Sequence, residues 1–155
     1  MIKGYVFSNQ LASNDVDSMI FRKMLDYNDG ILNGFEITHT TTSITVGEGT
    51  FLIAGRPVGV VGSESVTAGT SVAFCILVLE IDLTQTATPL TFEQASFKII
   101  SSGTAYPTVT QEDMDNGGEI YQVELAKFKT TANGITEFTV TAPQLDYDAI
   151  QTQIS

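Results

Sequence analysis

The sequence predicts a mainly β fold, an antiparallel β-sandwich or flattened barrel of about seven strands with one N-terminal helix. The first reason is composition: 43% of residues are hydrophobic and only 16% are charged, while Thr, Ser, Gly, Val and Ile recur throughout. The second is the alternation of apolar and polar residues in short segments that Gly, Pro and Asn turns separate. The third is that one early stretch follows a helical period. This combination argues against an α/β fold with a parallel sheet.

The chain of 155 residues has the length of a single domain. We expect one β-rich domain over residues 1–142, with a helix near residues 14–27, followed by a tail over residues 143–155. The tail has a weakly apolar side and is compatible with a short helix, although a helix of that length is not stable alone.

The helix near residues 14–27 is predicted from apolar spacing and from the residues that suit its two ends. These are Ser13 or Asn14 as a cap, and Asp29 with Gly30 as a stop. Its core-facing stripe is expected to contain Val16, Met19, Ile20, Lys23, Met24 and Tyr27. Phe21 and Leu25 widen this stripe beyond the needs of one sheet face. Either the helix is wedged deeply into the core, or a second face meets another subunit.

The following strands are predicted from alternation and turn chemistry. Residues 35–62 hold two or three strands, with Gly47-Glu48-Gly49 and Ala54-Gly55-Arg56-Pro57 as turn signals. Residues 71–83 form a continuous apolar run, which is typical of a central strand covered on both faces. Residues 92–103 and 120–143 add three more strands, with Asn133-Gly134 as a hairpin turn.

Charge and targeting signals narrow the possible partners and location. The formal net charge of −11 repels phosphate backbones and anionic lipids, so neither nucleic acid nor a membrane is expected as a partner. The first ten residues lack the apolar core of a signal peptide, and no apolar run has the length of a membrane helix. We expect a soluble protein that is synthesised in a cytoplasm without a signal peptide.

The acidic stretch at residues 113–124 has the spacing of a calcium-binding EF-hand loop. Its matching residues are Asp113, Asp115, Gly118 and Glu124, whereas Gly117 does not match. If a strand follows the loop, Glu124 lies roughly 20 Å from Gly118, too far to complete one calcium site. A weaker calcium site on Asp113, Asp115 and Glu119 stays open, but a solvated acidic turn is favoured.

No constellation of residues predicts catalysis, a cofactor or a metal site. His39 is the only histidine and is expected to decorate a strand or to bond a neighbouring Thr. Cys75 lies within the apolar run and is expected to be a core residue. The carboxylate pairs Glu80 with Asp82 and Asp146 with Asp148 could serve a hydrolase only if they face a cleft, and solvated surface carboxylates are more common.

Two further residues are candidates for binding. Arg56, beside Pro57 in a predicted turn, either bridges acidic neighbours or engages a carboxylate of a partner. Tyr106 is the one obvious loop aromatic for a sugar or receptor, although a binding pocket usually needs more than one ring.

Three segments resemble a pattern in tail and baseplate proteins of long-tailed, siphovirus-type bacteriophages. They are residues 30–60 (GILNGFEITHTTTSITVGEGTFLIAGRPVGV), 74–83 (FCILVLEIDL) and 120–136 (IYQVELAKFKTTANGIT). The resemblance implies a β-sandwich similar to the shoulder domain that anchors receptor-binding proteins to the tail, with no catalytic residues.

The function expected from this resemblance is that of a non-enzymatic structural protein in the virion, at the phage tail tip or baseplate. Its partners would be other tail or baseplate proteins and further copies of itself in a homo-oligomer. The alternatives are a module that binds host cell-wall saccharide or a receptor, and a hydrolase fragment. These hypotheses differ in what they require: an exposed interface, a pocket of aromatic residues, or a carboxylate pair in a cleft.

Overall fold

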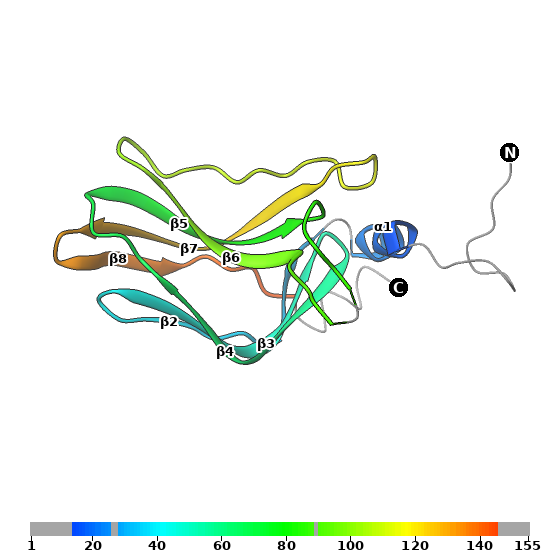
Figure 1. Ribbon diagram of the computed structural model, residues 1–155, viewed down its shortest axis with the longest axis horizontal. Helices are drawn as coiled ribbons and strands as arrows, with labels where there is room; N and C mark the ends of the chain where they lie inside the picture. The colour runs from blue at the N-terminus through cyan, green and yellow to red at the C-terminus, as the bar shows by residue number, and fades with distance from the viewer. Residues whose placement is uncertain (1–13, 26–27, 89, 146–155) are drawn as a thin grey trace, which may run out of the picture.

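The computed structural model describes residues 14–25, 28–88 and 90–145, without the side chains of residues 14–17 and 21. They form two antiparallel four-stranded sheets packed face to face, with one short helix at an end of the sandwich (Figure 1). The predicted fold class is confirmed. The elements are α1 (Asn14–Met24), β1 (Gly30–Gly34), β2 (Ile37–His39), β3 (Ser43–Ile53), β4 (Arg56–Thr67), β5 (Ala73–Asp82), β6 (Ala95–Ser102), β7 (Ile120–Thr131) and β8 (Gly134–Val140).

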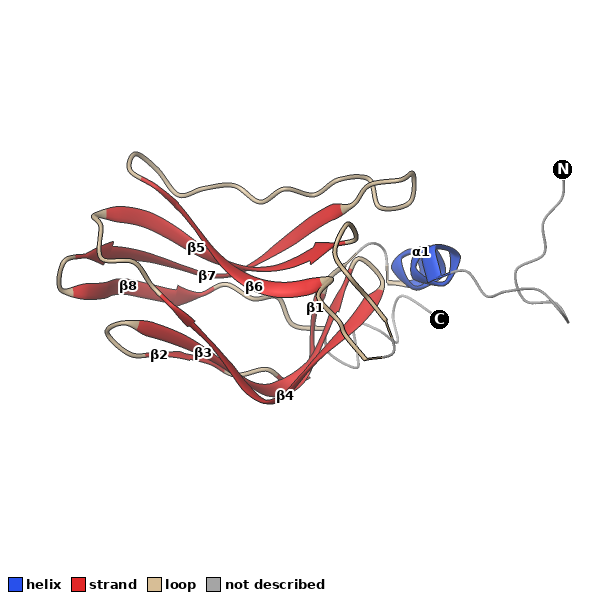
Figure 2. Cartoon of the chain, viewed as in Figure 1, coloured by secondary structure: helices blue, strands red, loops and turns tan. Residues whose placement is uncertain are grey.

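The first sheet is built around β3 and bends sharply. One edge of β3 pairs with β2 and then with β1, while the other edge pairs with β4. The prediction of a turn at residues 47–49 is wrong, because β3 runs through this stretch with only a register shift. Gly49 is needed there because a Cβ would lie 2.2 Å from the backbone nitrogen of Phe35. Such a bulge bends a strand and increases its twist, as the course of β3 and β4 shows (Figure 2).

The second sheet has the strand order β6-β5-β7-β8, and β5 is its buried centre. The prediction that this strand is covered on both faces is confirmed. Cys75, Leu77 and Leu79 belong to the core between the sheets. Ile76 and Val78, which alternate with them, are also fully buried but point to the opposite face. The predicted hairpin at Asn133-Gly134 is confirmed as the connection between β7 and β8.

The outer face of the second sheet is covered by residues 103–119, which connect β6 to β7 without a strand of their own (Figure 2). Tyr106 packs edge-on against Phe74 of β5, with the ring centroids 5.1 Å apart. Thr110 and Gln122 of β7 exchange hydrogen bonds: each backbone N–H donates to the other residue, at 2.9 Å to Oε1 of Gln122 and 2.8 Å to the carbonyl of Thr110. This covering segment was not predicted from the sequence.

Hydrogen bonds join the two sheets along one side of the sandwich. The N–H of Ile135 in β8 donates to the carbonyl of Thr41, which follows β2, at 2.8 Å. Further along, Ile31 of β1 donates to the carbonyl of Pro143 and accepts from the N–H of Leu145, both at 2.9 Å. Residues 143–145 therefore pack on the sandwich, whereas the predicted tail helix falls in residues 146–155, outside those described.

α1 lies across one end of the sandwich with an orientation opposite to the predicted one. Its docked face carries Ser18 and Arg22, and a Cβ at Gly55 would lie 2.1 Å from the carbonyl oxygen of Ser18. The helix backbone rests directly on the turn between β3 and β4, and the face of α1 that meets this turn is polar instead of carrying the apolar stripe. The prediction of a buried stripe is therefore wrong for Met19, Ile20 and Met24, which are 38%, 49% and 45% exposed. Leu25 is half-buried. The structure does not describe the side chains of Val16 and Phe21, and it does not describe Tyr27.

Candidate functional site

Two adjoining hollows lie on the side of the sandwich opposite the hydrogen-bonded one. They have volumes of about 380 Å³ and about 530 Å³ and share Val58, Phe92 and Ala95 in their linings. Together they form a groove between β4 and β6, which we call the seam groove and define by Arg56, Val58, Glu64, Phe92, Ala95 and Phe97. It is the candidate binding site because it is concave and combines apolar side chains with polar groups, as binding sites usually do.

The seam groove exists because β4 and β6 are edge strands. In the described part of the chain, β4 pairs only with β3, and β6 pairs only with β5. Each strand therefore has an outer edge whose alternate N–H and C=O groups have no ladder partner. The inner face of the groove consists of side chains that close the sandwich core, including Val60 and Leu79.

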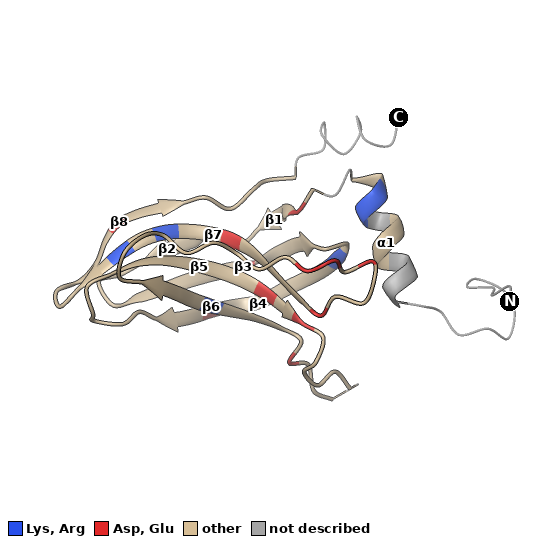
Figure 3. Ribbon diagram, turned by 90° about the horizontal axis from the view of Figure 1, so that it is seen from above, with Lys and Arg blue, Asp and Glu red and all other residues tan. Residues whose placement is uncertain are grey.

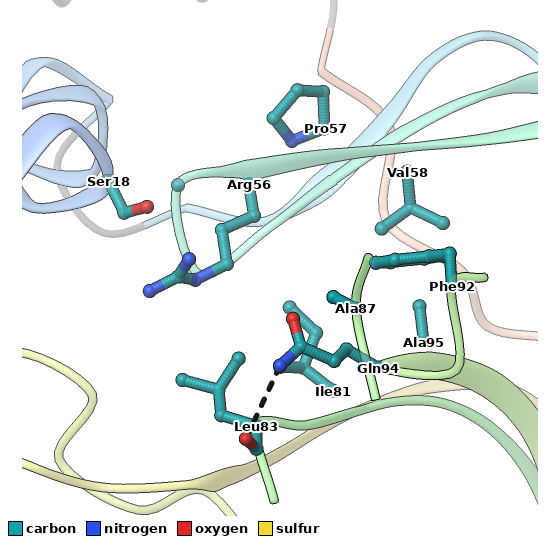
Figure 4. A pocket seen from close by; sticks show the side chains of 11 residues that line it. Ser18, Arg56, Pro57, Val58, Ile81, Leu83, Ala87, Phe92, Gln94 and Ala95 are labelled. Atoms are coloured by element: carbon teal, nitrogen blue, oxygen red, sulfur yellow. Dashed lines mark hydrogen bonds between the residues drawn. The ribbon is translucent and has the colours of Figure 1, made fainter. Parts of the chain in front are cut away.

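The groove is polar at its two ends. At the end near α1, Arg56 opens β4 and lies close to Gln94, whose Nε2 donates to the carbonyl of Leu83 at 3.3 Å (Figure 4). Further along, the Phe92 ring lies against the side of the groove facing Val58 (Figure 4). Glu64 lines the far part of the groove. The two predicted roles of Arg56 stay open, but its position at a groove end suits recognition of a carboxylate.

A cluster of polar side chains fixes α1 to the sandwich beside this site. The Tyr121 hydroxyl donates to Oδ2 of Asp29 at 2.8 Å, and Oδ1 of Asp29 accepts from the N–H of Ala54 at 2.8 Å. Arg22 of α1 lies over the Tyr121 ring, 5.5 Å from its centroid, and pairs with Asp115 at 3.3 Å. Burial, and then the hydrogen bond to Asp29, raise the pKa of Tyr121 to about 12.

The acidic residues 112–119 form a hydrogen-bonded turn beside α1 (Figure 3). Asp113 accepts from the N–H of Asp115 at 3.2 Å and from Nδ2 of Asn116 at 2.8 Å. Glu112 accepts from two backbone N–H groups after the turn, which lower its pKa. Glu124 lies within β7, where it accepts from the Thr141 hydroxyl at 2.6 Å. Among the described residues, no group of three or more His, Cys, Asp or Glu side chains could hold a metal ion.

His39 and Cys75 occupy the positions expected from the sequence. His39 contacts the carbonyl of the neighbouring Thr40 through Nδ1 at 3.1 Å, and its ring stacks on Phe138 with centroids 4.2 Å apart. The stack joins β2 to β8 across the two sheets. Cys75 is buried in the core with its Sγ 3.7 Å from the Thr130 hydroxyl.

Glu80 and Asp82 of β5 were expected to be solvated surface carboxylates, but their surroundings differ from this expectation. Glu80 is only 5% exposed, because the covering segment lies over this face, and it forms an ion pair with Lys98 of β6. Its Oε1 also accepts from Nε2 of Gln122 at 2.9 Å. Asp82 is half-buried, and a hydrogen bond from the Thr84 hydroxyl lowers its pKa. Asp146 and Asp148 lie outside the described residues.

Sequence reasoning missed the exposed apolar residues beside the seam groove. Leu90 is 97% exposed and Phe92 63% exposed, in a connection closed by a bridge between Ala87 and Phe92. Val61 of β4 is 88% exposed. The available signal was the presence of large apolar residues in the turn-rich stretch TATPLTFEQ, where a solvated loop would carry polar ones. Tyr106, by contrast, is half-buried under Lys127, 5.3 Å from its ring centroid.

Comparison with known protein families and with curated protein sequences finds no match to this chain. In the part of the chain that the structure describes, no helix has the length and apolar character needed to cross a membrane.

Proposed function

We propose that this protein is a non-enzymatic structural module of a phage tail tip or baseplate, which assembles by contacts with neighbouring proteins and with copies of itself. The resemblance of residues 30–60, 74–83 and 120–136 to tail proteins supports the location. A two-sheet sandwich is the architecture that this resemblance implies.

The observation that carries an assembly role is the outward face of α1. Met19, Ile20 and Met24 are large apolar side chains, yet they lie on the solvent side of an eleven-residue helix whose other side is docked. Exposed apolar residues that gather on one helix face are typical of a surface that another protein covers. The seam groove contains no nucleophile beside a base among its described lining residues, which favours binding over catalysis.

The experiment is a measurement of native mass by light scattering on the purified protein and on the double variant Ile20→Asp with Met24→Asp. We expect the unmodified protein to form a closed oligomer and the variant to lose it, because two buried carboxylates at the interface would be unpaired. Val72→Asp is the matched control, since Val72 is 81% exposed and lies before β5 rather than in α1.

Two outcomes would contradict this proposal. If the unmodified protein stays monomeric at high concentration, the proposal that it forms a homo-oligomer is wrong. If the oligomer persists in the double variant, the proposal that α1 forms its interface is wrong. The tail location has a separate test, because the protein should then be found by mass spectrometry in purified virions of a phage that carries it.

A further inference from the structure

The chain contains three Asn-Gly pairs, which are Asn33-Gly34, Asn116-Gly117 and Asn133-Gly134. In such a pair the backbone nitrogen of the glycine can attack the side-chain amide of the asparagine, because glycine has no side chain to obstruct the approach. The glycine has a positive φ in all three pairs, at 53°, 91° and 111° in chain order. Differences in reactivity between the pairs therefore come from their surroundings.

Attack requires a rotation of the backbone as well as of the side chain. A five-membered ring closes only when the glycine nitrogen reaches Cγ of the asparagine, so the peptide group between the two residues must turn about the asparagine Cα–C bond. A peptide group that is held in a β-ladder, or packed against another backbone, turns only when the local structure opens.

The pair Asn33-Gly34 is held in β1 against β3. Gly34 is in register with Gly49, and a Cβ on Gly34 would lie 2.3 Å from the carbonyl oxygen of Glu48. The next residue, Phe35, donates its N–H to the same carbonyl at 3.0 Å. The peptide group before Gly34 therefore cannot turn without separating β1 from β3.

The pair Asn133-Gly134 is held by the hairpin between β7 and β8. The N–H of Ile135 donates to Thr41, away from β7, so the N–H and C=O of the adjacent Gly134 point toward its partner Thr131. Gly134 is also buried, and a Cβ on it would lie 2.4 Å from the carbonyl oxygen of Thr41. Rotation here requires the end of the hairpin to open.

The pair Asn116-Gly117 has neither restraint. Both residues are exposed, and a Cβ on Gly117 would meet nothing within 4 Å. Within the part of the chain that the structure describes, the N–H of Gly117 makes no hydrogen bond. The Asn116 side chain donates from Nδ2 to Oδ2 of Asp113 at 2.8 Å, in an exposed position. Such a bond is readily exchanged for bonds to water, whereas a strand opens only when several bonds break together.

We propose that Asn116 is a site of self-modification, where this protein converts the asparagine to aspartate and isoaspartate. The Gly117 nitrogen loses its proton to solvent base and bonds to Cγ of Asn116. The Cγ–Nδ2 bond breaks, and Nδ2 takes up a proton from water and leaves as ammonia. One water molecule then opens the resulting succinimide at either of its two carbonyls, which gives aspartate or isoaspartate. The reaction consumes water and releases ammonia without a change of oxidation state.

The conversion alters the turn that holds α1. Asp113 accepts from the N–H of Asp115 and from Nδ2 of Asn116, and Asp115 pairs with Arg22 of α1 at 3.3 Å. A carboxylate at position 116 replaces a donor by a group that repels Asp113. The turn then loosens and Asp115 holds Arg22 less firmly. This inference goes beyond the proposed function and does not rest on it, because the reaction needs no partner.

Peptide mass spectrometry of the full-length protein measures the conversion after incubation at mildly alkaline pH in water enriched in heavy oxygen. Cleavage after lysine places the three pairs on separate peptides. The peptide with Asn116 should incorporate one heavy oxygen and separate into two chromatographic forms, at least about tenfold faster than the peptides with Asn33 and Asn133. In concentrated urea the three rates should become similar, because the dipeptides are identical.

Asn116→Gln is the matched variant, since its longer side chain would have to close a six-membered ring, and it should lose the labelled product. If Asn116 reacts no faster than the other two asparagines in the folded protein, the proposal is wrong. A rate advantage that persists unchanged in urea would also overturn it, because the fold would then not be the cause.

Hydrogen exchange tests the effect on α1. Asn116→Asp introduces the charge of the product directly, while Asn133→Asp adds the same charge at the hairpin turn at the opposite end of the sandwich (Figure 1). The amides of α1 should exchange several-fold faster in Asn116→Asp than in Asn133→Asp, with the amides of β5 equally slow in both. Equal exchange of the α1 amides would overturn the link between this site and the helix.

Discussion

Tyr121 shows at the scale of one residue how the helix is held on the sandwich. Its hydroxyl donates to Asp29, which precedes β1, and its ring lies under Arg22 of α1. Arg22 in turn pairs with Asp115 of the covering segment. Tyr121 is 5% exposed. A single buried phenol thus couples the orientation of α1 to two connections that are distant in sequence, and through them to the α1 end of the seam groove.

Tyr121→Phe should lower the free energy of unfolding by about 1–2 kcal/mol, because a hydrogen bond to a carboxylate is lost while the ring contact with Arg22 is kept. Urea unfolding near pH 8 measures the difference. Tyr106→Phe is the matched control, since no hydrogen bond of the Tyr106 hydroxyl occurs among the described contacts. Equal effects of the two substitutions would show that the Asp29 bond contributes nothing.

The pH dependence of this contribution has a definite sign. The pKa of Tyr121 is about 12 in the folded protein, above its ordinary value of 10.0, so folding favours the neutral phenol. The tyrosine contribution is therefore complete below pH 10 and is lost as the pH rises toward 12. We expect the stability difference between the unmodified protein and Tyr121→Phe to shrink across this range. A difference that stays constant there would contradict the raised pKa.

At the scale of elements, two glycines with the same backbone conformation have different roles. Gly55 and Gly62 have φ values of 74° and 75°. A Cβ at Gly62 meets nothing within 4 Å, whereas one at Gly55 would lie 2.1 Å from the Ser18 carbonyl. Gly62→Ala should cost about 1–2 kcal/mol of folding free energy from backbone strain alone. Gly55→Ala should cost more, because α1 must also move.

Urea unfolding of both glycine variants checks this prediction, and the helix itself provides a second readout. Displacement of α1 in Gly55→Ala should expose the Tyr121 ring, which its fluorescence would detect, while Gly62→Ala should leave it unchanged. Equal losses of stability and unchanged fluorescence in both variants would mean that the helix does not rest on the turn.

The sequence predicts strands better than it predicts what covers them. β5 and the hairpin between β7 and β8 could be predicted because a continuous apolar run and an Asn-Gly turn are local signals. The burial of Glu80 could not, because it depends on Lys98, Gln122 and a covering segment from elsewhere in the chain. The face of α1 was also assigned wrongly, since periodicity identifies an apolar stripe but does not show that a polar face with Ser18 and Arg22 meets the turn at Gly55.

The seam groove lay beyond sequence reasoning for a similar reason. Its two borders come from β4 and β6, which pair with different partners in different sheets. Free edges become visible only once the strand order is known, and strand order cannot be derived from alternation. Arg56 was singled out from its turn, but its place at one end of a groove depends on the position of Gln94 and Ala95 in space.

At the scale of the whole molecule, charge opposes the compact state. The chain has eighteen acidic residues and seven basic ones, so carboxylates repel one another over its surface. Raising sodium chloride from about 0.05 M to about 0.5 M should raise the thermal midpoint by a few degrees, because salt screens this repulsion. Choline chloride should act equally. A midpoint that falls with salt would show that ion pairs such as Lys98 with Glu80 dominate instead.

The hydrogen bonds between Ile31 and residues 143–145 also determine how the molecule responds to mechanical tension. β1 and the segment 143–145 run parallel at this bridge, so chain entering at β1 and chain leaving after Leu145 pull them in opposite directions along their length. Stretching the protein by its ends therefore shears both bonds at once instead of opening them one at a time. The side of the sandwich that these hydrogen bonds join would bear the load, whereas the edge strands β4 and β6 on the opposite side would carry little of it.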